Sequence, residues 1–220
     1  MKPVLLFDKD GTLIDTEKQY HTAWLEAFRA YGRPISEEQA LELRSLGAPF
    51  QTQYIQSIAG EDADCGEIRS LRESEFQRLL EEQGLKLKPY ARETLTALRE
   101  HGYRMALVTA SSLVRAEEEL RKVGLYDAFE MILSARTVER GKPAPDVYAY
   151  ACRQLSVAPE DTIVVEDSPN GVMAGVSCGC KVIMIPDLTE PDAELEKKLY
   201  RKIADLKELR EYLIGLLEFS

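Results

Sequence analysis

The sequence predicts an α/β protein with a doubly wound, Rossmann-like parallel sheet and an all-helical insertion after the first strand. Two observations support this fold class. Short continuous apolar runs alternate with helical segments through most of the 220 residues, as in parallel sheets that are buried on both faces. Residues 16–85 break this rhythm, because they contain helical patterns and no strand-like run. We therefore expect a core domain of residues 1–15 and 86–220 and a helical cap domain of residues 16–85.

The core elements follow in order along the chain. The expected strands are the apolar runs Pro3–Phe7, Arg104–Thr109, Glu130–Leu133, Thr162–Glu166 and Lys181–Ile185. The expected core helices are Ala91–Glu100, Leu113–Lys122, Pro145–Leu155, a helix from Pro169 toward Gly179, and Ile203–Leu217. Ser168 followed by Pro169 is typical of an N-cap with proline in the first helical position.

The insertion carries its own helix signals. One helix is indicated by an apolar stripe at helical spacing, formed by Tyr20, Trp24, Ala27, Phe28 and Tyr31. Ser36 with Gln39 resembles a capping box. A further helix is indicated by Leu71, Phe76, Leu79 and Leu80. An insertion at this point would form a lid over the carboxyl end of the first strand, where open α/β sheets bind ligands.

Composition narrows the function classes. The formal net charge is −10, and there is no block of Lys and Arg, which argues against a nucleic-acid partner. No apolar run approaches the roughly 18 residues of a membrane span, so we expect no membrane partner. The first apolar run meets Asp8 and Asp10 too early for a signal peptide. We expect a cytoplasmic protein that is a monomer rather than an obligate oligomer.

The four cysteines are Cys65, Cys152, Cys178 and Cys180. They form no Cys-x-x-Cys pair, and the two histidines are distant in sequence, so we expect no zinc site. We expect small buried residues in a reducing compartment.

The segment Asp8-Lys9-Asp10-Gly11-Thr12 places two carboxylates at the end of the first strand. Asp8 is suited to attack phosphorus, while Asp10 is suited to protonate the leaving oxygen and later to deprotonate a water. Gly11, which follows Asp10, permits the turn that brings Asp10 back over the site. The same letters also occur in surface turns and calcium loops, but the following Leu13-Ile14 lacks the further oxygen ligands of a calcium loop.

Three later segments follow further strands or helices. Thr109-Ala110-Ser111 offers hydroxyl and N–H groups for phosphate oxygens, with a plain helix cap as the alternative. Lys142 lies in a stiff loop with two prolines, with a solvated surface lysine as the alternative. Glu166 and Asp167 end another strand, so that one sheet edge would gather several carboxylates together with Asp8. Such a cluster requires a cation, and hard oxygen ligands favour Mg²⁺.

Taken together and in this order, these motifs closely resemble those of the haloacid dehalogenase-like superfamily, over nearly the whole chain. The segment Phe7-Asp8-x-Asp10-Gly11-Thr12-Leu13-x-Asp15-Thr16-Glu17 is particularly specific. The helical insertion resembles the cap of the subgroup with phosphoglycolate phosphatases, sugar-phosphate phosphatases and β-phosphoglucomutase.

The resemblance implies a role for each motif residue. The expected catalytic residues are the nucleophile Asp8, the acid/base Asp10, the phosphoryl-binding Thr109 and the charge-neutralising Lys142. The expected Mg²⁺ ligands are Asp8, the Asp10 carbonyl, Asp167, and Glu166 directly or through a water. The expected substrate or phosphate contacts are Gly11, Thr12, Ala110, Ser111, Tyr20 and Arg44. The sequence assigns no role to Lys9.

The expected activity is Mg²⁺-dependent hydrolysis of a small phosphate ester, such as a sugar phosphate, through an aspartyl-phosphate on Asp8. A phosphomutase is the first alternative, but Tyr20 occupies the position of the histidine in β-phosphoglucomutase. Packing within the cap is the alternative role for Tyr20, and simple exposure is the alternative for Arg44. A non-catalytic phospho-ligand binder would have lost Asp8 or Asp10, and a metal-free dehalogenase would not need the pair Glu166 and Asp167.

Overall fold

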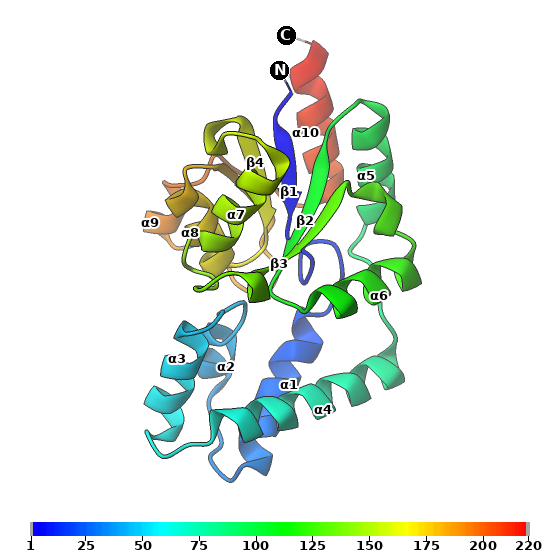
Figure 1. Ribbon diagram of the computed structural model, residues 1–220. Coiled ribbons are helices and arrows are strands. Elements are labelled where there is room, and N and C mark those ends of the chain that lie inside the picture. The colour runs from blue at the N-terminus through cyan, green and yellow to red at the C-terminus, as the bar shows by residue number, and fades with distance from the viewer. Residues whose placement is uncertain (1, 219–220) are drawn as a thin grey trace.

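A six-stranded parallel sheet forms the centre of the protein in the computed structural model, which describes residues 2–218 (Figure 1). The spatial strand order is β3-β2-β1-β4-β5-β6. The strands are β1 Val4–Phe7, β2 Met105–Thr109, β3 Met131–Ser134, β4 Thr162–Glu166, β5 Lys181–Met184 and β6 Arg201–Lys202. The two halves of the order run outward from β1, so the sheet is doubly wound and the fold prediction is confirmed.

Apolar side chains leave both faces of β1 because successive residues point to opposite sides of a strand. Leu5 and Phe7 enter one core, while Val4 and Leu6 enter the other. All four are buried, which explains why the sequence of this strand is a continuous apolar run rather than an alternating one.

Helices cover both faces (Figure 1). The face of Leu5 packs against α5 Ala91–Glu100, α6 Leu113–Val123 and α10 Leu206–Glu218. The face of Leu6 packs against α7 Asp146–Leu155, α8 Pro169–Cys178 and α9 Ala193–Glu196. Three short 3-10 helices complete the core, namely η1 Tyr126–Ala128, η2 Ala135–Thr137 and η3 Pro159–Asp161. No helix within residues 2–218 combines the length and apolar character needed to cross a membrane.

The chain between β1 and α5 forms four helices, drawn in blue to teal below the sheet in Figure 1. They are α1 Glu17–Ala30, α2 Glu37–Glu42, α3 Phe50–Ala59 and α4 Cys65–Gln83. Trp24 and Phe28 of α1 are buried in a small core of their own, and the capping box of Ser36 and Gln39 is present at the start of α2. We call this group of helices the cap.

The expected strands and core helices all occur, with ends displaced by a few residues. The largest displacement is at the last helix, which begins at Leu206 rather than Ile203. Strand β6 is an addition, because both of its residues, Arg201 and Lys202, are exposed. A two-residue polar edge strand leaves no apolar pattern in the sequence.

Candidate active site

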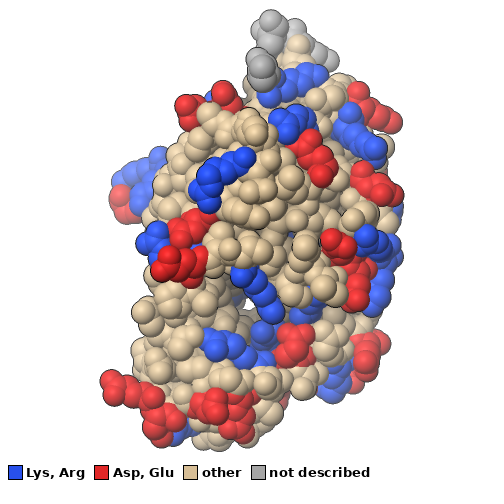
Figure 2. All heavy atoms as spheres, viewed as in Figure 1, with Lys and Arg blue, Asp and Glu red and all other residues tan. Residues whose placement is uncertain are grey.

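The carboxyl ends of the parallel strands meet the cap around a cavity of about 490 Å³. Asp8 and Asp10 follow β1, and Ala110 and Ser111 follow β2, and all four line this cavity. Figure 2 shows a hollow between the upper and lower parts of the molecule, with Lys and Arg atoms gathered around it. The sheet therefore brings residues that are 100 positions apart to one wall, as expected for this fold.

Lys142 is the direct partner of Asp8. Its side chain is 1% exposed, and its Nζ lies 2.5 Å from Asp8 Oδ1. The same Nζ also donates to Glu166. Burial alone would lower the pKa of Lys142, but the charges of Asp8 and Glu166 raise it well above its ordinary value. The alternative of a solvated surface lysine is therefore wrong.

Glu166 is fully buried and has protein partners on both carboxylate oxygens. Oε1 accepts from the Tyr148 hydroxyl at 2.7 Å, and Oε2 accepts from the backbone N–H of Asp167 at 3.1 Å. Gly171, in the first turn of α8, leaves the space for this carboxylate, since an added Cβ would lie 1.9 Å from Oε1. These contacts hold Glu166 beneath Lys142.

Asp167 lies over the turn that follows Asp10. An added Cβ at Gly11, where φ is +80°, would lie 2.3 Å from Asp167 Oδ2, so only glycine fits both this conformation and this approach. The hydroxyl of Thr12 donates to Asp167 Oδ1 over 3.4 Å. Gly11 and Thr12, which we expected to bind phosphate, thus both lie against Asp167 of the acidic cluster.

Oxygen ligands of Asp8, Glu166 and Asp167 all lie within 4.8 Å of one another. Burial, followed by the repulsion of neighbouring carboxylates, raises the pKa of Asp167 well above its ordinary value. Asp167 Oδ2 is buried and has no hydrogen-bond partner among the described residues. Hard, converging carboxylate oxygens, one of them without a hydrogen-bond partner, fit Mg²⁺. Because both Glu166 oxygens have protein partners, the indirect role through a water suits it better than direct ligation.

Asp10 is held by three side chains. Oδ1 accepts from the Thr16 hydroxyl at 2.6 Å and lies 3.3 Å from Lys9 Nζ, and Oδ2 accepts from the Ser111 hydroxyl at 3.2 Å. Burial alone would raise the pKa of Asp10, but the charge of Lys9 and the bond from Thr16 lower it below its usual range. Asp10 is therefore a carboxylate in a fixed orientation beside Asp8.

Lys9, to which the sequence analysis assigned no role, is fully buried. Besides Asp10 it contacts Glu119 of α6. The other oxygen of Glu119 accepts from Arg115 at 2.8 Å, and Arg115 pairs with Glu73 of the cap at 2.8 Å. A continuous row of alternating charges therefore runs from Asp10 to the cap.

Thr109 ends β2 and is fully buried, and its hydroxyl accepts from the Ser111 N–H at 3.1 Å. Thr109 does not line the cavity, whereas Ala110 and Ser111 do. The turn after β2 therefore presents Ser111 toward Asp10, with Thr109 shaping the turn from behind.

The cap contributes Arg44 and Tyr20 to the cavity wall. Arg44 is 5% exposed, so its simple exposure is ruled out, and it lies 3.5 Å from both Glu17 and Asp167. Tyr20 stacks on Phe76 with ring centroids 3.9 Å apart. Tyr20 therefore packs within the cap and also lines the cavity.

The cap is also joined to the Lys142 loop through backbone atoms. Gly47 N–H donates to the Lys142 carbonyl at 2.9 Å, and Gly141 N–H donates to the Ala48 carbonyl at 2.7 Å. An added Cβ on Gly47 would lie 2.5 Å from the Gly141 Cα. The two loops touch so closely that both positions require glycine.

The sequence of residues 3–179 matches the haloacid dehalogenase-like hydrolase family. This chain belongs to that family. The prediction of a haloacid dehalogenase-like hydrolase with a helical cap is thereby confirmed.

Relatives of the hydrolase support the same placement. It is 34% identical over 202 residues to hexitol phosphatase A of Escherichia coli, with 86% of this chain and 88% of that protein covered. It is 33% identical over 195 residues to the phosphorylated carbohydrates phosphatase of Thermotoga maritima, covering 87% and 89%. The crystal structure of CbbY from Rhodobacter sphaeroides in complex with phosphate superposes with a TM-score of 0.75 at 28% identity, covering 95% and 96%.

Sequence reasoning missed several residues of the hydrolase's site. Four arginines besides Arg44 line the cavity: Arg69, Arg72, Arg115 and Arg136. Within the described residues, Arg72 Nε and Arg115 Nη2 are buried without a hydrogen-bond partner. The spacing of Arg69 and Arg72 places both on one face of a helix, which is a signal that sequence reasoning could have used.

Glu17 and Tyr148 were also missed. Burial raises the pKa of Glu17 to about 8, with the charge of Arg44 opposing this and nearby carboxylates adding to it. Glu17 follows the Asp15-Thr16 pair of the first motif, so its sequence position pointed to it. Tyr148 gave no such signal, because it reaches Glu166 from an apolar helix.

Proposed function

We propose that this hydrolase is a Mg²⁺-dependent phosphomonoesterase that acts on a small phosphorylated metabolite through an aspartyl-phosphate on Asp8. The observation that carries the proposal is the position of Asp8 in the cavity wall, paired with Lys142 and adjacent to a second, fixed carboxylate, Asp10. The named activities of the relatives support the same reaction class.

Charge neutralisation is the first requirement of this reaction. An anionic nucleophile and a phosphate oxygen at about 4 Å repel by about 4 kcal/mol per pair of unit charges at an effective dielectric near 20. Lys142 offsets this repulsion at Asp8. A bound Mg²⁺ would supply Lewis-acid stabilisation of the charge on the transferring group, held by Asp8, Asp167, the Asp10 carbonyl and, through a water, Glu166.

In the first step a carboxylate oxygen of Asp8 forms a bond to phosphorus while the ester oxygen leaves with a proton from Asp10. In the second step a water attacks the phosphorus and gives its proton to Asp10, which restores Asp8. Asp10 is a carboxylate in the resting site; the arriving phosphate charge raises its pKa, so that it takes up a proton from solvent or from the substrate's phosphate monoanion before the first step. The proton that it accepts from water in the second step returns to solvent when phosphate leaves. Its bonds to Thr16 and Ser111 keep it oriented in both steps.

For phosphate binding we propose Ser111 and the N–H groups of the Ala110 turn, with Thr109 supporting that turn. Gly11 and Thr12 act through Asp167, which they contact. Neither residue lines the cavity, and their expected direct contact with phosphate stays a prediction.

We propose that residues 16–85 act as the cap domain that selects the substrate. The cavity of about 490 Å³ suits a metabolite rather than a macromolecule. Its arginine-rich wall suits an oxygen-rich anionic substrate, and two of the relatives are named as phosphatases of hexitols and of phosphorylated carbohydrates. Sugar and polyol phosphates are therefore the proposed substrate class, bound with the help of Arg44 and Tyr20.

The test is phosphate release from a panel of sugar and polyol phosphates with Mg²⁺, compared with Asp8→Asn. We expect the wild-type enzyme to turn over at least one compound and a folded Asp8→Asn variant to turn over none. Retained release by that variant would refute the nucleophile assignment. Full activity in EDTA would refute the metal requirement.

The same panel separates hydrolysis from phosphoryl transfer. With β-glucose 1-phosphate and a trace of the bisphosphate, a phosphomutase would form glucose 6-phosphate faster than free phosphate. We expect the opposite, because Tyr20 offers no histidine at the position used by the mutase relatives.

A further inference from the structure

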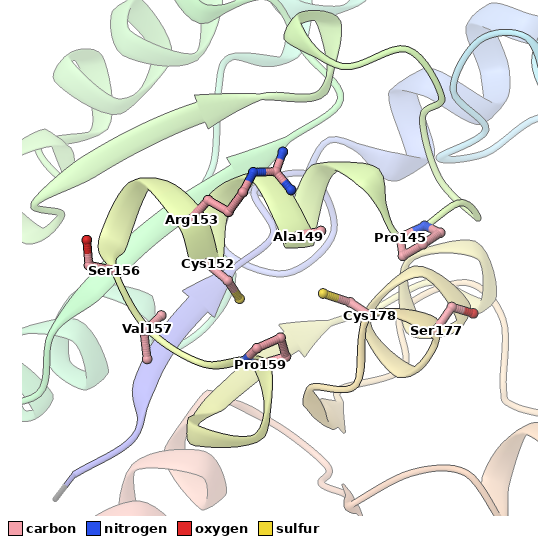
Figure 3. A pocket seen from close by; sticks show the side chains of 9 residues that line it. All are labelled: Pro145, Ala149, Cys152, Arg153, Ser156, Val157, Pro159, Ser177 and Cys178. Carbon is pink, nitrogen blue, oxygen red and sulfur yellow. The ribbon is translucent and has the colours of Figure 1, made fainter.

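Three of the four cysteines converge at a second site, away from the cavity described above. Cys152 lies on α7, Cys178 is the last residue of α8, and Cys180 directly precedes β5. One sulfur from each lies within 4.8 Å of the other two. Figure 3 shows the sulfurs of Cys152 and Cys178 pointing toward each other from the two helices. The spacing of these residues in the sequence gives no sign of the cluster.

The separation of the sulfurs matches the demands of one metal ion. Thiolates bound about 2.3 Å from a tetrahedral ion lie roughly 4 Å apart. Two of the three side chains are buried, and all three sit at the junction of packed elements. The cluster therefore needs little rearrangement to close around an ion.

A solvent path leads to the cluster. A cavity of about 460 Å³ is lined by Cys152 and Cys178, together with Arg153, Val157 and Pro159. It shares no lining residue with the active-site cavity. Cys178 is only partly buried, so an ion and a water ligand can reach it.

We propose that Cys152, Cys178 and Cys180 form a binding site for a soft divalent cation, Zn²⁺, with a water from the adjacent cavity as the fourth ligand. Three sulfur donors discriminate against Mg²⁺, which prefers oxygen. Among the described residues no His, Asp, Glu or further Cys joins the three sulfurs, which leaves the fourth position to solvent. A filled site would link α7 to α8 and β5 by coordination bonds.

The test uses full-length, reduced protein that has been stripped of metal and saturated with Mg²⁺. Zn²⁺ is added in competition with a chromophoric chelator, and its stoichiometry is compared between wild type, Cys178→Ser and Cys65→Ser. Cys65 lies in the cap, so its variant is the matched control. Wild type and Cys65→Ser are expected to bind one Zn²⁺ more per chain than Cys178→Ser.

Two further measurements distinguish Zn²⁺ coordination by Cys178 from a change in the fold of the variant. Zn²⁺ should slow alkylation of Cys178, and at 100 times its dissociation constant it should raise the melting temperature of wild type by about 5 °C or more. Cys178→Ser should fold, because this side chain is partly exposed, and should lose the thermal shift. Equal Zn²⁺ stoichiometry in all three proteins would overturn the proposal.

In a separate experiment, the reduced protein is treated with oxidised glutathione and its free thiols are counted. Loss of two thiols to a bond between these cysteines, with no Zn²⁺ bound by the reduced protein, would overturn the metal site and assign the cluster to thiol oxidation instead.

Discussion

Lys9→Met isolates the contribution of the buried cation next to Asp10. Lys9 Nζ lies 3.3 Å from Asp10 Oδ1, which corresponds to an attraction of about 5 kcal/mol at an effective dielectric near 20. Removing one partner of a buried ion pair commonly costs about 3–5 kcal/mol. We expect Lys9→Met to lose that much free energy of unfolding, because Asp10 and Glu119 would both lose their shared counter-ion.

Activity should fall as well. General acid/base catalysis contributes roughly 10²–10⁴-fold, and Asp10 keeps its bonds to Thr16 and Ser111 in the variant. We therefore expect the turnover number to fall by about 10- to 100-fold and the acid limb of the rate profile to move to higher pH, since the cation that lowers the pKa of Asp10 is gone.

Urea denaturation and the pH dependence of phosphate release measure the two effects separately. In the double variant Lys9→Met/Glu119→Gln, part of the stability should return, because the Glu119 charge is removed, while the turnover number should stay low. Glu119→Gln alone is the control, since it keeps the contact of Lys9 with Asp10. Wild-type turnover with an unshifted pH profile in a folded Lys9→Met protein would refute the reasoning.

Three further outcomes are expected. Burial and neighbouring charges raise the pKa of Asp8 to about 7 and of Glu17 to about 8, so stability that is present when these carboxyls are protonated is lost as pH rises through these values. In chelator the melting temperature should thus be lower at pH 8.5 than at pH 5. Mg²⁺ should raise the melting temperature more at pH 8.5 than at pH 5, and an equal increase at both pH values would contradict this. Gly47→Ala should lower kcat/KM about 10-fold or more by displacing the cap. The control Gly215→Ala should match wild type, because no atom lies within 4 Å of its added Cβ. Equal kinetics of the two variants would count against the cap contact. Arg72→Ala should raise KM about 10-fold with little change in kcat. The control Arg78→Ala should leave KM unchanged, because the partners of Arg78 are Glu75 and Glu82 on the same exposed face. An unchanged KM in both variants would show that Arg72 does not contact the substrate.

The sheet and the core motifs were predictable because they are local patterns. A strand buried on both faces must be a continuous apolar run, and parallel strands necessarily bring their carboxyl ends together. Asp8, Asp10 and Glu166 were therefore placed at one edge from sequence alone. The family resemblance added their expected roles.

The remainder depends on contacts between distant segments. Lys9 becomes intelligible only when Glu119, 110 residues away, is placed beside it. Thr12 was expected at phosphate but lies against Asp167, because the turn at Gly11 directs it there. The three-cysteine cluster arises from the packing of α7 on α8, which no spacing rule encodes.

The paired glycines at positions 47 and 141 join the cap to the loop that carries Lys142. Swinging the cap away would break the hydrogen bond from Gly47 to the Lys142 carbonyl and the one from Gly141 to Ala48, and would withdraw Arg44 from Asp167. The loop that carries Lys142, the counter-ion of Asp8, would then lose this support. Under the proposed mechanism, a molecule with a displaced cap would therefore be a poor catalyst.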